Sequence, residues 1–126
     1  MKTKINNVIR ILFGISFVAF GADKFLEFIP HGHEMTESLM NAYMGLVANK
    51  FILPTVGIIE LLVGILLILN KYINLALIAM VPISFGIVAF HLAVDIPGMA
   101  IGTLVALLNA YFILLRKKEL NCLLKT

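Results

Sequence analysis

Four long apolar runs constrain the fold of this chain more than any other feature. They cover about residues 8–29, 51–69, 73–94 and 97–115, and prolines or polar turns separate them. A helix needs about 20 predominantly apolar residues to cross a bilayer, and each run is close to that length. The runs are continuous and too long for membrane strands, which alternate between apolar and polar residues. The sequence therefore predicts an all-α integral membrane protein, a four-helix bundle.

The composition agrees with a membrane protein of one domain. Charged residues make up 13% of the chain and hydrophobic residues 61%, whereas a soluble domain has about 25% charged residues. Four spans use most of the 126 residues, so we expect one domain, 1–126. The basic residues collect at span ends rather than in a stripe with aromatics, so we expect the lipid bilayer and no nucleic acid as a partner. The single cysteine, Cys122, excludes the enzymes that form disulfides with paired cysteines.

The N-terminus has some features of a secretory signal peptide. Basic residues precede the first apolar run, and the small residues of "AFGA" follow within it. The apolar segment nevertheless continues from Phe25 to Ile29, which makes it too long for the hydrophobic region of a signal peptide. We expect this segment to be the first membrane span.

The basic residues predict the orientation in the membrane. Two of them, Lys24 and Lys50, fall on one side of the predicted spans. Eight fall on the other side: Lys2, Lys4, Arg10, Lys71, Arg116, Lys117, Lys118 and Lys125. Because cytoplasmic loops are rich in Lys and Arg, both termini are predicted to lie in the cytoplasm.

The segment 31–50 is then the one sizeable external element. Its later part, "ESLMNAYMGLVANK", places apolar residues at helical spacing: Leu39, Tyr43, Leu46 and Val47. This pattern predicts a short helix that lies at the membrane interface.

Two helical faces bring charged residues and glycines together. On the first span the face comprises Arg10, Gly14, Phe17, Gly21, Lys24 and Phe28, and on the second it comprises Gly57, Glu60 and Gly64. Glycines let two membrane helices approach closely, so we expect Glu60 to point into the bundle. At about 1.5 Å per residue, Glu60 falls near the middle of its span, whereas Lys24 lies roughly 8 Å outward of its own span's midpoint and Arg10 roughly 13 Å inward. We therefore predict that Lys24 holds Glu60 and that Arg10 is too far away for direct contact.

This seam of Arg10, Lys24 and Glu60 has two open interpretations. Ionisable residues inside a membrane are usually functional, which favours a ligand or partner site. Alternatively, Glu60 is a packing residue that hydrogen-bonds between helices and has no chemistry.

A second charged group lies near the outer end of the predicted bundle. It comprises Asp23 and Glu27 on the first span and His91 and Asp95 at the end of the third. Asp23 and Glu27 are four residues apart and need a cation nearby, for which Lys24 and a protonated His91 are candidates. The group forms either part of a ligand pocket or a charge cluster at the water boundary.

The segment "HGHEMTE" suggests a metal site at first sight. It brings together His31, His33, Glu34 and Glu37. Imidazole and carboxylate groups suit zinc, nickel or copper, but this spacing matches no fixed ligand pattern. We expect a polar loop without a metal site.

The last two spans carry polar residues with structural explanations. Gly98, Gly102, Ala106 and Asn109 share one face of the fourth span, which predicts a small-residue packing surface with one polar tie. On the third span, the Ser84 hydroxyl is expected to bond back to its own helix.

The chain resembles the DoxX family of small four-helix membrane proteins. The resemblance rests on "RILFGISFVAFGADKF", on "GLVANKFILPTVGIIELLVGILLIL" and on the short polar turn that follows. It is strongest over the first 70 residues. Carried over residue by residue, the family's arginine and lysine fall on Arg10 and Lys24, and its glutamate on Glu60. The resemblance implies a multi-pass protein of the bacterial cytoplasmic membrane and an association with redox systems, including thiosulfate oxidation coupled to quinone reduction.

The favoured function is an accessory membrane subunit, more non-catalytic than catalytic, whose seam binds a small amphipathic or quinone-like ligand or docks a protein partner. If it is enzymatic, we expect a component of a quinone-linked oxidoreductase. A proton-coupled small-molecule transporter and an assembly factor without ligand chemistry are the alternatives, and a homo-oligomer is compatible with all three. Because His91 is the one histidine within a span, two-histidine haem ligation inside one chain is excluded.

Overall fold

A computed structural model describes residues 3–26 and 36–124 of the chain. In chain order the elements are α1 (Lys4–Leu26), α2 (Glu37–Ala48), α3 (Ile52–Leu69), α4 (Ile73–Val94), the 3-10 turn η1 (Ile96–Gly98), α5 (Met99–Leu115) and α6 (Lys117–Leu124). Four segments, α1, α3, α4 and η1 together with α5, are long and apolar enough to cross a membrane. The predicted fold class, a helical membrane bundle, is confirmed.

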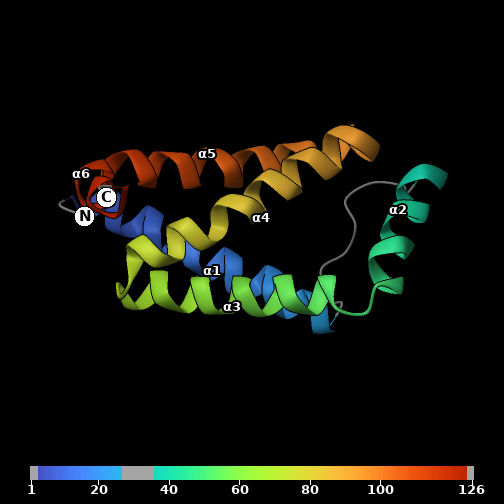
Figure 1. Cartoon of the computed structure of the whole chain (residues 1–126), viewed down its shortest axis with the longest axis horizontal. Coiled ribbons are helices and arrows are strands. Elements are labelled where there is room, and N and C mark those ends of the chain that lie inside the picture. The colour runs from blue at the N-terminus through green and yellow to red at the C-terminus, as the bar shows by residue number, and fades with distance from the viewer. Residues whose placement is uncertain (1–2, 27–35, 125–126) are drawn as a thin grey trace.

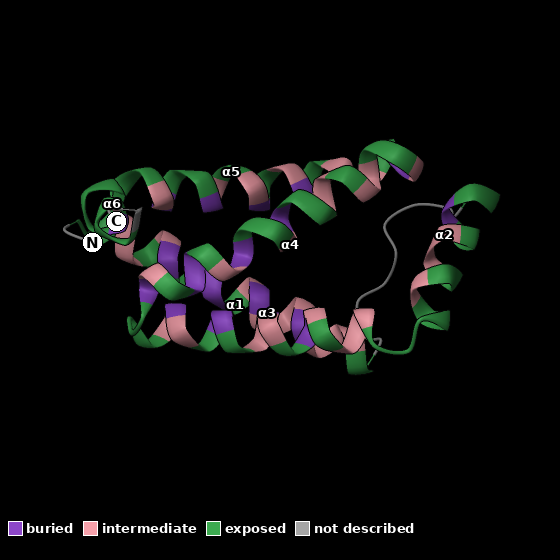
Figure 2. Ribbon diagram, viewed as in Figure 1, coloured by how far each residue is buried: buried purple, intermediate pink, exposed green. Residues whose placement is uncertain are grey.

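The bundle is built from helix pairs that are neighbours in space. Helix α1 runs along α3, and α4 crosses from α3 to α5 (Figure 1). The start of α1 and helix α6 lie at the same end of the bundle (Figure 1). The exposed residues face outward and the buried ones face the neighbouring helices (Figure 2), as expected for a bundle whose outer surface contacts lipid.

Aromatic side chains form the core between the first and last spans. The rings of Phe13 and Phe17 lie with their centroids 4.5 Å apart. Phe13 also stacks on Phe112 of α5, with a centroid distance of 5.9 Å. Leu67 and Leu77 are fully buried in the same cluster. Helix α1 therefore packs on α5 as well as on α3.

The predicted polar turn joins α3 to α4. Asn70 and Tyr72 both have left-handed backbone conformations, with φ of 57° and 50°. Asparagine tolerates this region better than most residues. The Asn70 N–H donates to the carbonyls of Leu66 and Leu67, which closes the end of α3. The two helices are thereby brought side by side through a very short connection.

Helix α2 confirms the short helix predicted within residues 37–50. Its N-terminus is capped by Thr36, whose hydroxyl accepts from the Leu39 N–H at 3.2 Å. Leu39 is buried. The helix lies across one end of the bundle, beside the start of α3 (Figure 1), which fits a position at the membrane interface.

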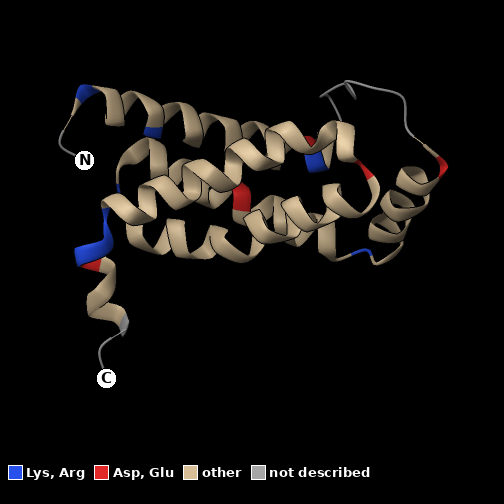
Figure 3. Cartoon of the chain, turned by 90° about the horizontal axis from the view of Figure 1, so that it is seen from above, with Lys and Arg blue, Asp and Glu red and all other residues tan. Residues whose placement is uncertain are grey.

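Helix boundaries differ from expectation at both ends of the chain. Helix α1 begins at Lys4, earlier than residue 8, and residues 27–29 of the expected first span lie outside the described residues. The fourth span ends at Leu115 as predicted, but an unpredicted helix, α6, begins at Lys117. Arg116, with φ of −104° and ψ of 19°, separates the two helices. Figure 3 shows α6 turning away from the bundle.

Of two predicted polar contacts, the one made by Asn109 on α5 is present, and the one made by Ser84 on α4 is not found among the described residues. The Asn109 amide donates to the Leu77 carbonyl at 3.2 Å, as a polar tie to a neighbouring helix. A Cβ on Gly102 would lie 2.8 Å from Ile87, so this glycine permits close packing of α4 on α5. The buried Ser84 hydroxyl has no hydrogen-bond partner among the described residues, so the expected bond to its own helix was wrong.

Candidate functional site

Glycines bring the backbones of α1 and α3 into direct contact. A Cβ on Gly64 would lie 2.6 Å from the Gly14 carbonyl oxygen, and one on Gly21 would lie 2.7 Å from that of Gly57. Such distances leave no room for any side chain. The predicted glycine-lined contact between the first two spans is confirmed.

Lys24 and Glu60 form an ion pair across this contact. The Lys24 Nζ donates to Glu60 Oε2 at 2.6 Å. The Glu60 side chain is 1% exposed and the Lys24 side chain 22%. The predicted contact between the two residues is therefore present, with the carboxylate enclosed by the bundle and the ammonium nearer its surface.

Arg10 binds the end of α3 rather than Glu60. Its guanidinium Nη1 donates to the Leu67 carbonyl and, at 3.4 Å, to the Ile68 carbonyl. Arg10 is buried, and its Nε has no hydrogen-bond partner among the described residues. Leu67 is seven residues beyond Glu60, which is about 10 Å along a helix. The three residues of the predicted seam therefore form two separate polar contacts between α1 and α3, one made by Arg10 and the other by Lys24 and Glu60.

Two members of the predicted outer cluster, His91 and Asp95, lie together at the end of α4. On α4, His91 Nε2 lies 3.7 Å from Asp95 Oδ2, and His91 Nδ1 lies 2.7 Å from the Ile87 carbonyl oxygen. Since a carbonyl only accepts, Nδ1 carries the hydrogen in this contact. The Asp95 Oδ1 accepts from the Gly98 N–H at 3.3 Å and so caps η1.

Asp23 and Lys24 lie on the other helix pair. The end of α4 lies beside α5, away from the end of α1 and the start of α3 (Figure 1). Among the described residues, Lys24 pairs with Glu60 and His91 with Asp95. Glu27 lies outside the described residues, as does most of "HGHEMTE", so the expectation of no metal site there stays a prediction.

The sequence profile of the DoxX family matches residues 6–95, which is well over half of the chain. The chain belongs to the DoxX family. The matched region contains most of α1 and all of α2 to α4, and with them Arg10, Lys24 and Glu60. No curated protein and no solved structure matches this DoxX chain. Family membership therefore identifies the type of membrane protein, while the role of its polar residues has to be inferred from their geometry.

Two features of the DoxX site were missed by sequence reasoning. The acceptors for Arg10 are main-chain carbonyls, which no residue type marks. The ring of Phe25 lies against Gly57, since a Cβ there would be 2.9 Å from the ring. Phe25 directly follows Lys24 and is half exposed. The sequence signal available for Phe25 was its place directly after Lys24.

Proposed function

We propose that this DoxX-family chain is a non-catalytic accessory membrane subunit, and that Lys24 and Glu60 bind a small amphipathic, quinone-like ligand. The observation that carries the proposal is the unequal exposure of the ion pair. Glu60 is 1% exposed and binds the Lys24 ammonium from the interior of the bundle, whereas the Lys24 side chain is 22% exposed. A lysine ammonium has three donors and can serve a ligand oxygen as well as its carboxylate.

The surroundings of Lys24 favour a ligand with one polar edge and an apolar body. Phe25 is half exposed beside Lys24, and Ile58 on α3 is also exposed. A quinone carbonyl would accept from Lys24 while its ring packs on Phe25, and its isoprenoid tail would extend into the lipid. Glu60 would keep the ammonium in place and compensate its charge in the membrane.

The experiment is extraction of the lipids that copurify with the chain in a mild detergent. Wild type is expected to retain a quinone in near-stoichiometric amount, identified by its ultraviolet spectrum and by mass spectrometry. Lys24→Met and Glu60→Gln should each lower the retained amount by about tenfold, because one charge-assisted hydrogen bond is lost. Lys4→Met removes a cation from the exposed start of α1 and serves as the matched control.

Three results would contradict the proposal. Equal quinone retention by wild type and by Lys24→Met, in equally monodisperse samples, would show that the Lys24–Glu60 pair does not bind the quinone. Uptake of a small molecule that depends on a proton gradient would favour a transporter. A stoichiometric protein partner without any small molecule would favour an assembly factor.

A further inference from the structure

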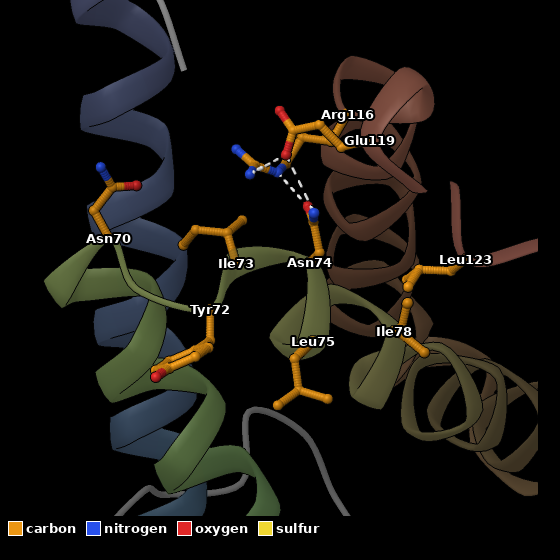
Figure 4. Close-up of a pocket in the computed structure, with 9 residues that line it drawn as sticks. All are labelled: Asn70, Tyr72, Ile73, Asn74, Leu75, Ile78, Arg116, Glu119 and Leu123. Atoms are coloured by element: carbon orange, nitrogen blue, oxygen red, sulfur yellow. Dashed lines mark hydrogen bonds and ion pairs between the residues drawn. The ribbon is translucent and has the colours of Figure 1, made fainter. Parts of the chain in front are cut away.

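A pocket lies at the end of the bundle opposite to Lys24. It has a volume of about 560 Å³ and is formed by the α3–α4 turn, the start of α4 and the α5–α6 junction (Figure 4). Pockets that bind small molecules have volumes of roughly 300–1,000 Å³. The lining residues Arg116, Glu119 and Leu123 lie beyond the segment that matches the family. This pocket is independent of the proposed Lys24–Glu60 site.

One side of the pocket is polar, and hydrogen bonds connect its side chains. Arg116 donates from Nε to Asn74 Oδ1 and from Nη2 to Glu119 Oε2, both at 2.5 Å. The Asn74 amide also donates to Glu119 Oε2, at 3.2 Å. The dashed lines in Figure 4 connect these three side chains. The remaining guanidinium nitrogen, Nη1, has no hydrogen-bond partner in the described part of the chain, so Arg116 is held in place with one donor group available.

The other side of the pocket is apolar and accessible from outside the bundle. Leu75 and Ile78 of α4 and Leu123 of α6 contribute to this side. Their exposed fractions are 62%, 43% and 65%. Because α4 is a membrane span, the exposed side chains of Leu75 and Ile78 are on a helix that contacts lipid. A ligand here must therefore combine a polar group with an apolar body.

The charged residues around the pocket indicate that the polar group of the ligand is anionic. Lys71, Lys117 and Lys118 are exposed and adjoin lining residues in the sequence, and Arg116 is itself in the lining. Glu119 is the one acid in the lining. Figure 3 shows basic residues beside an acidic one at the start of α6. Basic pockets between membrane helices bind the headgroups of anionic lipids.

We propose that this pocket binds an anionic glycerophospholipid. Its phosphate accepts from Arg116, and its acyl chains extend along Leu75, Ile78 and Leu123. Arginine suits this role because its planar guanidinium binds phosphate oxygens through directed hydrogen bonds. The lysines next to the pocket strengthen the attraction without defining the geometry. Helix α6 contributes Glu119 and Leu123 to the lining.

Native mass spectrometry of the full chain in a mild detergent tests the site. The protein is titrated with phosphatidylglycerol and, separately, with phosphatidylcholine of the same acyl chains. Wild type is expected to bind phosphatidylglycerol several-fold more tightly. Arg116→Gln should weaken this binding by roughly tenfold, which corresponds to one charge-assisted hydrogen bond. Lys118→Gln removes the same charge outside the lining and is expected to change affinity less than threefold.

Glu119→Gln gives a test of opposite sign that does not depend on removing Arg116. It deletes the carboxylate that competes with the phosphate, so affinity for phosphatidylglycerol should rise. The proposal is overturned if the two lipids bind equally, if Lys118→Gln weakens binding as much as Arg116→Gln, or if Glu119→Gln also weakens it. Complete competition by glycerol phosphate at equal concentration would assign the pocket to a soluble phosphate ester and would equally overturn it.

Discussion

The guanidinium of Arg10 donates a hydrogen bond to the main-chain carbonyl of Leu67, so a cation from α1 binds the carboxyl end of α3. The last carbonyls of a helix lack partners within the helix and carry partial negative charge. Arg10 satisfies two of the carbonyls near this end, those of Leu67 and Ile68. Together with Lys24 and Glu60, it joins α1 to α3 on both sides of the glycine contact.

Arg10→Met should therefore destabilise the chain. Hydrogen bonds that involve a charged group contribute about 1.5–3 kcal/mol, and the substitution removes the Arg10 donor from the Leu67 and Ile68 carbonyls. We expect a loss in that range in the free energy of unfolding, measured by reversible denaturation in mixed micelles. Lys4→Met, on the exposed first turn of the same helix, should change it by less than about 0.5 kcal/mol. Equal effects of the two substitutions would show that the Arg10 contact contributes nothing.

Gly64→Ala should separate α1 from α3. Its Cβ would lie 2.6 Å from the Gly14 carbonyl oxygen and 2.8 Å from the Val18 nitrogen, and main-chain atoms cannot yield as a flexible side chain does. Overpacking of this kind costs about 1–3 kcal/mol in stability. Gly86→Ala on α4 is the matched control, since no atom lies within 4 Å of its added Cβ. We expect this control to be neutral or stabilising in the same unfolding assay, and an equally tolerated Gly64→Ala would argue against the close contact.

Both termini are predicted to face the cytoplasm. Eight Lys and Arg residues fall on that side of the predicted spans and two on the other, and the start of α1 lies at the same end of the bundle as α6. Alkaline phosphatase fused after Thr126 should be inactive, and a fluorescent protein that matures in the cytoplasm should be bright at the same position. An active phosphatase fusion would reverse the orientation, because the enzyme is active only outside the cytoplasm.

The helices and their glycine faces could be predicted because their signals are local. Apolar runs of sufficient length imply spans, and helical spacing alone placed Glu60 and Gly64 on the face that meets α1. The Lys24–Glu60 contact followed from depth, since the difference between the two estimated depths is within the reach of a lysine side chain.

The remaining features depend on relationships that the sequence does not display. Arg10 binds main-chain carbonyls, so its acceptors could be found only once the end of α3 had a position in space. Helix α6 follows the charged residues that end the fourth span. Its lysines, glutamate and leucines are good helix formers, but the break at Arg116 that redirects it has no clear sequence signal.

The most direct test of the account is a double-mutant cycle on Lys24 and Glu60. Glu60→Gln and Lys24→Met are each expected to lower the free energy of unfolding in bicelles, because each leaves a buried or half-buried charge without its partner. Coupling between polar pairs in bilayers averages about 0.6 kcal/mol and reaches roughly 1.7. The double variant is expected to be less destabilised than the sum of the two single variants. Additive effects would contradict this expectation, since they would mean that Glu60 is not held by Lys24.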